Sequence, residues 1–383
     1  MPFDLKDQPL VTRSSSLKAL TDRLSQETIL AVDTESNSLH AYQEQVCLIQ
    51  FSTPDEDFLV DPLALDNLSP LAPIFANPAI EKVFHAAEYD LICLSRDFGF
   101  QFENLFDTMI AASILGRGEL GLGSLLEAEF GVQVQKRFQR ANWGKRPLPA
   151  ELIDYANMDT HYLIPLRHSL RLELESAGRW PLAVEDFHHL GQISLLLSDP
   201  PAQNGEKPAG GCWRISGAID LPPQQAAVLQ ELCHYRDVAA HSLNRPLFKV
   251  ISDATLLAVA AACPTRLDEL KGLPGMTAGQ IRRHGLNLLL AVQKGLQAPP
   301  IFRPRSRRPN EAYLSRLEAL RRLRKDLAEA MGVKSDVVLP RDLMLTLAAQ
   351  NPRHSEELAT LMADFPWRLE HFGSQILKAI SNA

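Results

Sequence analysis

The sequence predicts an α/β domain, built as a mixed sheet flanked by helices, over residues 1–200, followed by two all-α domains over 213–297 and 310–383. Short apolar runs alternate with helical patterns in the first half of the chain, whereas the second half shows helical periodicity without a convincing strand. Two proline-rich stretches, 199–212 and 298–310, separate these parts as linkers. The length of 383 residues also exceeds that of one ordinary domain.

Composition favours a globular protein of the cytoplasm. The chain is 45% hydrophobic and 22% charged, which excludes wholesale disorder. Its first residues lack the pattern of a secretory signal, and no apolar run is long enough to span a bilayer. The five cysteines are scattered without a C-x-x-C pair, which favours reduced thiols and argues against a zinc site.

Charge is distributed unevenly along the chain. The formal net charge is −7, but residues 1–200 carry 15 basic and 29 acidic side chains, whereas residues 201–383 carry 24 and 17. An acidic half that holds metal ions and a basic half that binds a polyanion would explain this division, and ordinary surface variation is the alternative. The stretch 303–325, with nine basic and two acidic residues, gives the strongest indication of polyanion binding.

The α/β part begins with a helix and three strands. We expect the helix over 15–24 and the strands over 29–35, 45–52 and 57–60. The connections between these strands are short, so they are expected to pair as an antiparallel meander.

Helices and strands alternate further along the chain. A helix near 70–76 leads to a strand at 82–85, and the next helix runs through Phe98 with Gly99 as its C-cap. The remaining elements are expected as a strand over 105–108, helices to 115 and over 120–130, and a long helix from 151. The alternation predicts parallel additions to the sheet, as in a ribonuclease-H-like fold.

Asp33 and Glu35 stand at the end of the first strand. Residues i and i+2 of a strand point to the same face, so the two carboxylates lie side by side. A stable fold keeps such a pair when a cation lies between them or when they share a proton. Mg²⁺ and Mn²⁺ prefer oxygen ligands and are the natural guests. The alternative is that both acids are solvated in a loop.

Three more residues are candidates for the same site. Asp90 lies in the first turn of the helix after residue 85, where an acidic side chain can also be an ordinary surface residue favoured by the helix dipole. Tyr155 and Asp159 are four positions apart on a helix and share one face. Neighbouring apolar residues turn that face toward the body of the domain.

This ordered set resembles the tyrosine-bearing branch of the DEDD exonuclease superfamily. The three motifs are matched by Asp33-Thr34-Glu35, by the segment from His85 to Asp90, and by Tyr155 with Asp159. The flanking sequences V-C-L-I-Q, F-D-T and W-x-x-R-P-L agree with this resemblance. Within the superfamily the chain looks most like the ribonuclease D family.

The helical parts resemble the HRDC modules that follow the nuclease in that family. The first match rests on Tyr235-Arg236, Pro264 and the sequence L-K-G-L-P-G. The more diverged second match rests mainly on Asn351-Pro352 and the region 358–376. The resemblance therefore implies an exonuclease domain over 1–200, a first HRDC domain over 213–297, and an HRDC-like domain over 310–383.

The resemblance implies hydrolysis of RNA from the 3′ end with release of nucleoside 5′-monophosphates. Two divalent ions about 4 Å apart can activate the water and stabilise both the phosphorane and the leaving oxyanion. Asp33 would bridge both ions, and Asp90 would help to hold the ion that faces the leaving 3′ oxygen. Glu35 and Asp159 would complete the site that activates water, and Tyr155 would orient that water.

Substrate contacts are less sharply indicated. His85 is a candidate contact near the 3′ end, although a lone histidine is more often structural. Four linker arginines are candidate phosphate contacts, namely Arg303, Arg305, Arg307 and Arg308. The basic loop 136–148 could also touch phosphates, or it could be a structural turn anchored by Trp143 and Arg146.

RNA as the substrate, with precursor tRNA as the expected class, follows from the resemblance alone. No membrane and no obligate protein partner are expected. A DNA 3′–5′ exonuclease of the same superfamily, a catalytically silent nucleic-acid-binding protein and a metal-dependent phosphatase acting on small molecules are the alternatives.

Overall fold

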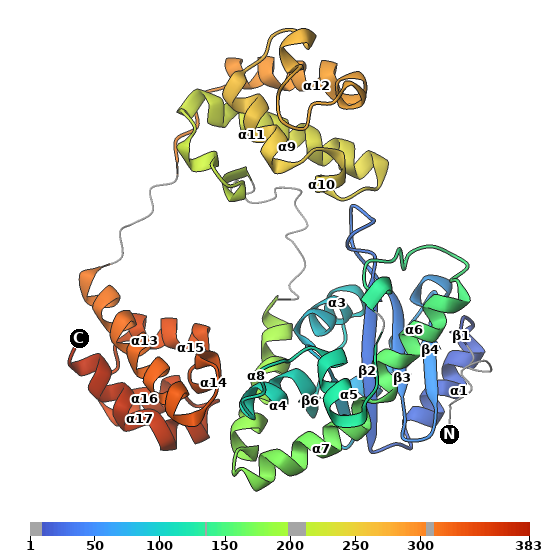
Figure 1. The fold of residues 1–383 in the computed structure, drawn as a ribbon, viewed down its shortest axis with the longest axis vertical. Helices are drawn as coiled ribbons and strands as arrows, with labels where there is room; N and C mark the ends of the chain where they lie inside the picture. Colours follow the sequence, from blue (N-terminus) through green and yellow to red (C-terminus); the bar gives the residue numbers. More distant parts are fainter. Residues whose placement is uncertain (1–9, 135, 198–211, 304–309) are drawn as a thin grey trace. The chain divides into compact units, whose positions relative to one another are not determined.

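The computed structural model describes residues 10–134, 136–197, 212–303 and 310–383. The chain divides into two compact units (Figure 1). The first contains residues 1–36, 46–199 and 308–383, and the second contains residues 37–45 and 200–307. Of the two linkers expected from the sequence, residues 199–211 of the first and 304–309 of the second lie outside the described residues. None of the described helices has the length and apolar character needed to cross a membrane.

A six-stranded sheet forms the centre of the first unit, with the strand order β1-β4-β3-β2-β5-β6. Its strands are β1 (Leu10–Val11), β2 (Ile29–Ser36), β3 (Val46–Ser52), β4 (Asp57–Val60), β5 (Glu81–Phe84) and β6 (Leu105–Asp107). Strands β2, β3 and β4 pair antiparallel, and β5 and β6 add in parallel, which confirms the predicted mixed sheet. Strand β1, which pairs parallel with β4, was not predicted.

Helices cover the sheet because its strands are apolar on both faces. Leu30 and Val32 of β2 pack into one apolar cluster, whereas Ala31 between them packs into another. The surrounding helices are α1 (Ser14–Leu24), α2 (Ala72–Phe75), α3 (Glu88–Phe98), α4 (Thr108–Ile114), α5 (Leu122–Phe130), α6 (Ala150–His161), α7 (Leu163–Ser176) and α8 (Trp180–Leu197). Gly99 adopts a left-handed conformation (φ 70°) and ends α3 as expected.

A five-helix module at the C-terminal side of the chain belongs to the same unit. It consists of α13 (Glu311–Met331), α14 (Ser335–Val338), α15 (Arg341–Gln350), α16 (Ser355–Leu361) and α17 (Pro366–Ser381). Arg368 of α17 is fully buried and contacts two acidic residues of α8, with 2.8 Å from Nη1 to Glu185 Oε2 and 2.8 Å from Nη2 to Asp186 Oδ1. The other oxygen of Glu185 accepts from the backbone N–H of Trp367 and Arg368 at the start of α17.

The described residues of the second unit form helices and connecting loops without a strand, as predicted for 213–297. Its helices are α9 (Pro223–Leu243), α10 (Leu247–Val250), α11 (Asp253–Ala262) and α12 (Ala278–Gln297). Residues 37–45, which connect β2 to β3, pack with these helices. The hydroxyl of Tyr42 donates to Asp237 Oδ1 at 2.8 Å, and the backbone N–H of Tyr42 donates to Asn244 Oδ1 at 3.1 Å.

Candidate active site

Asp33 and Glu35 lie half-buried near the end of β2. The antiparallel register places Asp33 directly opposite Gln50 of β3. Gln50 is fully buried, and its Nε2 donates to Asp33 Oδ2 at 3.5 Å. Because Glu35 is two positions farther along the strand, its side chain projects to the same face as Asp33.

Asp90 reaches the same region from the first turn of α3. It is 9% exposed and accepts a hydrogen bond from the hydroxyl of Thr34, which lies between the two acidic residues of β2. This contact joins the second predicted motif to the first across the sheet. Asp90 is therefore not an ordinary exposed residue of the helix surface.

Helix α6 contributes Tyr155 and Asp159. Burial raises the pKa of Tyr155, and the two side chains are close enough for the negative charge of Asp159 to raise it further. Leu152 and Ala156 of the same helix pack against Cys47 and other residues of β3, which fixes the face that α6 presents to the sheet. The expected long helix is interrupted at Tyr162, so α6 and α7 are separate helices.

These side chains meet at one pocket of about 510 Å³. Its walls include Asp33, Glu35, His85, Tyr155 and Asp159. Asp90 does not line the pocket but is bonded to Thr34, which does. The start of α5, residues 121–124, forms another part of the wall. The described lining residues include no lysine or arginine, so no protein cation neutralises the carboxylates inside the pocket.

Burial and mutual repulsion disfavour the ionised carboxylates. Burial, together with the charge of Asp159, raises the pKa of Asp33 well above its ordinary value. Burial and the charge of Asp33 raise the pKa of Glu35 to about 10, and burial raises the pKa of Asp159 to about 7. The pKa of Asp90 is also raised, by burial and by Asp33. A bound cation would reverse these shifts because it favours the ionised forms.

The donor chemistry of the pocket fits a divalent metal ion. Asp33 and Glu35 of β2 and Asp159 of α6 line the pocket, and Asp90 of α3 is bonded to the lining residue Thr34. Carboxylate oxygens are the ligand type that Mg²⁺ and Mn²⁺ prefer, and the described lining residues include no lysine or arginine to compensate their charge. Within the described ranges, no three His, Cys, Asp or Glu side chains stand together as a ready-made cage. The carboxylate side chains would therefore have to move toward one another to coordinate a metal ion.

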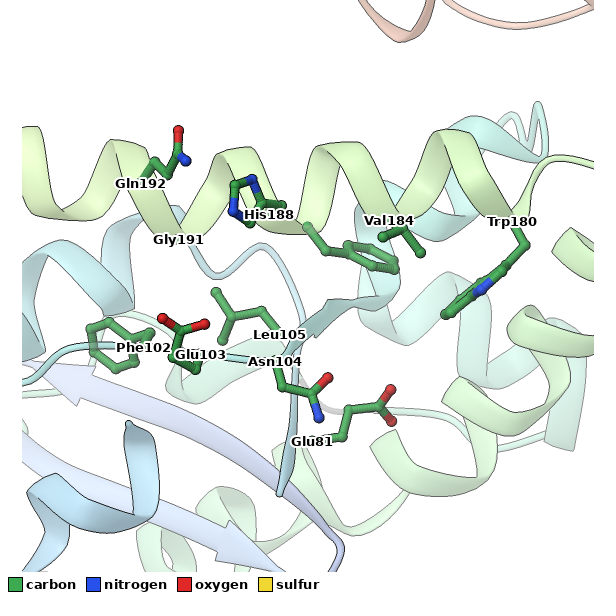
Figure 2. Close-up of a pocket in the computed structure, with 11 residues that line it drawn as sticks. Glu81, Phe102, Glu103, Asn104, Leu105, Trp180, Val184, His188, Gly191 and Gln192 are labelled. Carbon is green, nitrogen blue, oxygen red and sulfur yellow. The ribbon is translucent and has the colours of Figure 1, made fainter. Parts of the chain in front are cut away.

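A second pocket, of about 330 Å³, contains none of the predicted site residues. Trp180, Val184 and His188 of α8 line it, facing Phe102 and Leu105 (Figure 2). Its Glu81 is neutralised by Arg167, whose Nε lies 2.5 Å from Glu81 Oε2. This pocket is mostly apolar and lacks the group of uncompensated carboxylates found at the first.

The four linker arginines predicted as phosphate contacts are not among the described residues of the first unit. Arg303 is exposed and belongs to the second unit, and Arg305, Arg307 and Arg308 lie outside the described residues.

The basic loop has a structural anchor, as one of its two interpretations expected. Trp143 is 1% exposed, and the guanidinium of Arg146 makes two contacts of 2.6 Å with the buried carboxylate of Asp61.

Sequence reasoning did not assign a role to Gln50, Thr34, Thr108 or the start of α5. Gln50 and Thr108 belong to the flanking sequences that supported the resemblance. Their contacts depend on strand pairing: the register of β2 and β3 places Gln50 opposite Asp33, and the pairing of β5 with β6 brings Thr108 to His85. Gly121 and Gly123, at the start of α5, also border the pocket.

Comparison with protein families agrees with the division of the chain. A model described as 3′–5′ exonuclease matches residues 9–175, and a model described as HRDC domain matches residues 225–292 and 314–380.

Individual relatives extend this agreement. A ribonuclease D of Granulibacter bethesdensis is 30% identical over 321 residues, which cover 81% of this chain and 79% of that protein. Protein RRP6-like 3 of Arabidopsis thaliana is 35% identical over 68% of this chain, but the match spans only 31% of the plant protein. The crystal structure of Escherichia coli RNase D, an exoribonuclease involved in structured RNA processing, matches with a TM-score of 0.68 and 27% identity, covering 94% of this chain and 99% of that one.

Proposed function

Because this chain belongs to the ribonuclease D family, we propose that it removes nucleotides one at a time from the 3′ end of RNA and releases nucleoside 5′-monophosphates. As a member of this family it is a 3′–5′ exoribonuclease of the DEDD superfamily and depends on divalent metal ions. The observation that carries the proposal is the meeting of Asp33, Glu35, Tyr155 and Asp159 at one pocket, with Asp90 bonded to Thr34 of its wall.

The four carboxylates would hold two divalent ions, Mg²⁺ or Mn²⁺, with Asp33 shared between them. When bound, the ions would lower the pKa of the attacking water and neutralise charge that develops on the phosphate. Glu35 and Asp159 would serve the ion on the side of the water, and Asp90 the ion on the side of the leaving 3′ oxygen. Their high metal-free pKa values support this assignment, because ion binding relieves a repulsion already present.

Tyr155 would position the water. Burial, together with the negative charge of Asp159, raises the pKa of Tyr155, so its hydroxyl stays protonated at neutral pH. A protonated phenol has a lone pair that can accept a hydrogen bond from a water molecule. The start of α5 lines the same pocket, and the N-terminal end of a helix suits the phosphate of the substrate.

We propose structured RNA, such as precursor tRNA, as the substrate class, and the cytoplasm as the place of action. The linker arginines Arg303, Arg305, Arg307 and Arg308, together with the basic helix α13, would add phosphate contacts that do not depend on sequence. We also propose the domain limits 1–200, 213–297 and 310–383, within which the matched residues 9–175, 225–292 and 314–380 fall.

The test uses the full chain with Mg²⁺ or Mn²⁺ and matched 3′-tailed RNA and DNA oligonucleotides. We expect stepwise shortening of RNA from its 3′ end, which stops in EDTA and falls by at least about a hundredfold in Asp33→Asn because a metal ligand is lost. Circular dichroism of the variant controls for folding.

Two results would change the assignment. Equal shortening of DNA would point to a DNA exonuclease of the same superfamily. Binding of RNA without shortening of either oligonucleotide would leave a nucleic-acid-binding protein and reject the mechanism.

A further inference from the structure

His85 is held in one orientation at the wall of the carboxylate pocket. Its Nδ1 lies 2.8 Å from the hydroxyl of Thr108, and the same hydroxyl lies 3.1 Å from the backbone oxygen of Phe84. A hydroxyl has a single hydrogen, and a carbonyl oxygen can only accept. Both contacts are satisfied when Thr108 donates to Phe84 and accepts from an Nδ1–H of His85. The network thus assigns the proton to Nδ1 and leaves Nε2 with a free lone pair.

The backbone around His85 is fixed by the neighbouring residue of β6. Asp107 is 1% exposed, and its carboxylate accepts from the N–H of Ala86 at 3.2 Å and of Ala87 at 2.7 Å. The same carboxylate accepts from Met109 and Ile110 at the start of α4. It thereby ties the turn after β5 to α4. Ala86 adopts a left-handed conformation, with φ 60°, that this tie maintains.

The ring is neutral at physiological pH. Burial lowers the pKa of His85, and the opposing effect of the negative charge on Asp107 is smaller. Within the described part of the chain, Nε2 has no hydrogen-bond partner. An unprotonated ring nitrogen repels phosphate oxygens and attracts a hydrogen-bond donor, and Mg²⁺ prefers oxygen ligands to nitrogen. The group that Nε2 recognises therefore carries an O–H or N–H.

We propose that Nε2 of His85 accepts a hydrogen bond from a hydroxyl of the 3′-terminal ribose. This inference rests on the proposed function, which brings the 3′ end of RNA to this pocket. Ribose hydroxyls are the donors that every ribonucleotide carries, whereas donors on the bases differ from one nucleotide to the next. His85 would then be a residue that helps the enzyme to choose its terminal sugar.

The test compares three RNA oligonucleotides that differ only in the last sugar: ribose, 2′-deoxyribose or 3′-deoxyribose. For wild type, removing the contacted hydroxyl should lower kcat/KM about tenfold, the effect of one lost hydrogen bond. His85→Ala should show the same loss on the ribose-ended RNA and no further loss on the RNA that lacks the contacted hydroxyl. The two deoxy substrates show which hydroxyl is bound.

Thr108 supplies a matched pair of variants. Thr108→Ser keeps the hydroxyl that orients the ring and should retain the preference for the hydroxyl. Thr108→Val has nearly the same shape but no hydroxyl, so it should reduce the preference toward that of His85→Ala. The rise in melting temperature on adding Mg²⁺ should be unchanged in His85→Ala, because His85 acts on the sugar and not on the ions.

An equal penalty for His85→Ala on all three sugars would overturn the inference, and so would a penalty that follows the terminal base. Absence of RNA shortening by wild type would instead refute the proposed function. In that event, the affinities of Asp33→Asn and of Asp33→Asn with His85→Ala for the three oligonucleotides provide the same comparison without turnover. Loss of sugar discrimination in the double variant would support the contact, and retained discrimination would reject it.

Discussion

The carboxylates at the end of β2 carry repulsion that no protein cation in the described pocket wall relieves. The raised pKa of Glu35 has burial as its largest cause and the charge of Asp33 as its second. Each such side chain binds a proton more tightly in the folded state than in the unfolded chain. A metal ion and protons therefore compete for the same oxygens, and the outcome depends on pH.

This competition predicts how the metal-free protein responds to pH. Between pH 3.8 and about 7 the folded state holds more protons at Asp159 than the unfolded state, and the same is true at Glu35 between pH 4.5 and about 10. The stability due to these protons is present at the low end of each window and is lost as the pH rises. In EDTA, we expect the melting temperature to fall from about pH 6 to about pH 9.

Addition of Mg²⁺ should raise the melting temperature more at the higher pH, because the carboxylates are then ready to bind it. Asp159→Asn is the control, since it removes one titrating ligand and should flatten both trends. A Mg²⁺-induced shift of equal size at both pH values would contradict this account of the pocket.

Single residues also show what the sequence could predict. The positions of Asp33 and Glu35 on one strand face, and of Tyr155 and Asp159 on one helix face, follow from the periods of strands and helices. The partnership of Gln50 with Asp33 could not be predicted, because it depends on the register between two strands.

At the scale of elements, α6 depends on the loop that precedes it. Arg146 in this loop joins Asp61, which follows β4, and also donates to the backbone oxygen of Cys47 on β3 at 2.7 Å. The loop is thereby attached to two neighbouring strands before α6 begins at Ala150. The side chain of Asp61 is only 3% exposed, so its charge relies on this arginine.

Replacing Arg146 by Met should lower the free energy of unfolding by about 3 kcal/mol, because a buried carboxylate loses its partner. Urea unfolding followed by fluorescence measures the effect. Arg137→Met is a matched control from the same loop, since Arg137 and Glu151 are exposed and 3.4 Å apart, and such pairs contribute about 0–1 kcal/mol. Similar losses in the two variants would refute the anchoring role of Arg146.

Most elements were predictable because their patterns are long and regular. Strand β1 was missed because two residues carry no periodicity, and its existence depends on the edge that β4 offers. The break between α6 and α7 was missed because the apolar pattern continues across Tyr162 while the backbone does not.

On the scale of the whole molecule, the C-terminal helical module shares a compact unit with the nuclease fold. The contact between α8 and α17 is unusually polar for a buried one, since Arg368 is fully buried and satisfied by Glu185, Asp186 and the backbone oxygens of Val337 and Val338. The sequence showed two similar helical modules, but it could not show that the second packs on α8, because that contact joins residues more than 180 positions apart.

Arg368→Met should therefore destabilise the first unit by about 3–5 kcal/mol, since Glu185 and Asp186 keep their burial and lose their cation. We expect earlier unfolding in urea and faster proteolysis within α13–α17 than in wild type. Arg321→Met is the control, because Arg321 is exposed and lies 3.9 Å from Glu318. Unchanged stability of Arg368→Met would show that the apolar contacts alone hold the module in place.

The distance in sequence between Glu185 and Arg368 also has a consequence in time. A ribosome adds about 5–20 residues per second, so roughly 10–40 s separate the synthesis of Glu185 from that of Arg368. During this interval the nascent nuclease part can fold while two carboxylates of α8 remain hydrated. The two carboxylates become buried only after Arg368 has been synthesised. We therefore expect the nuclease part to fold first and the C-terminal helical module to pack against α8 afterwards.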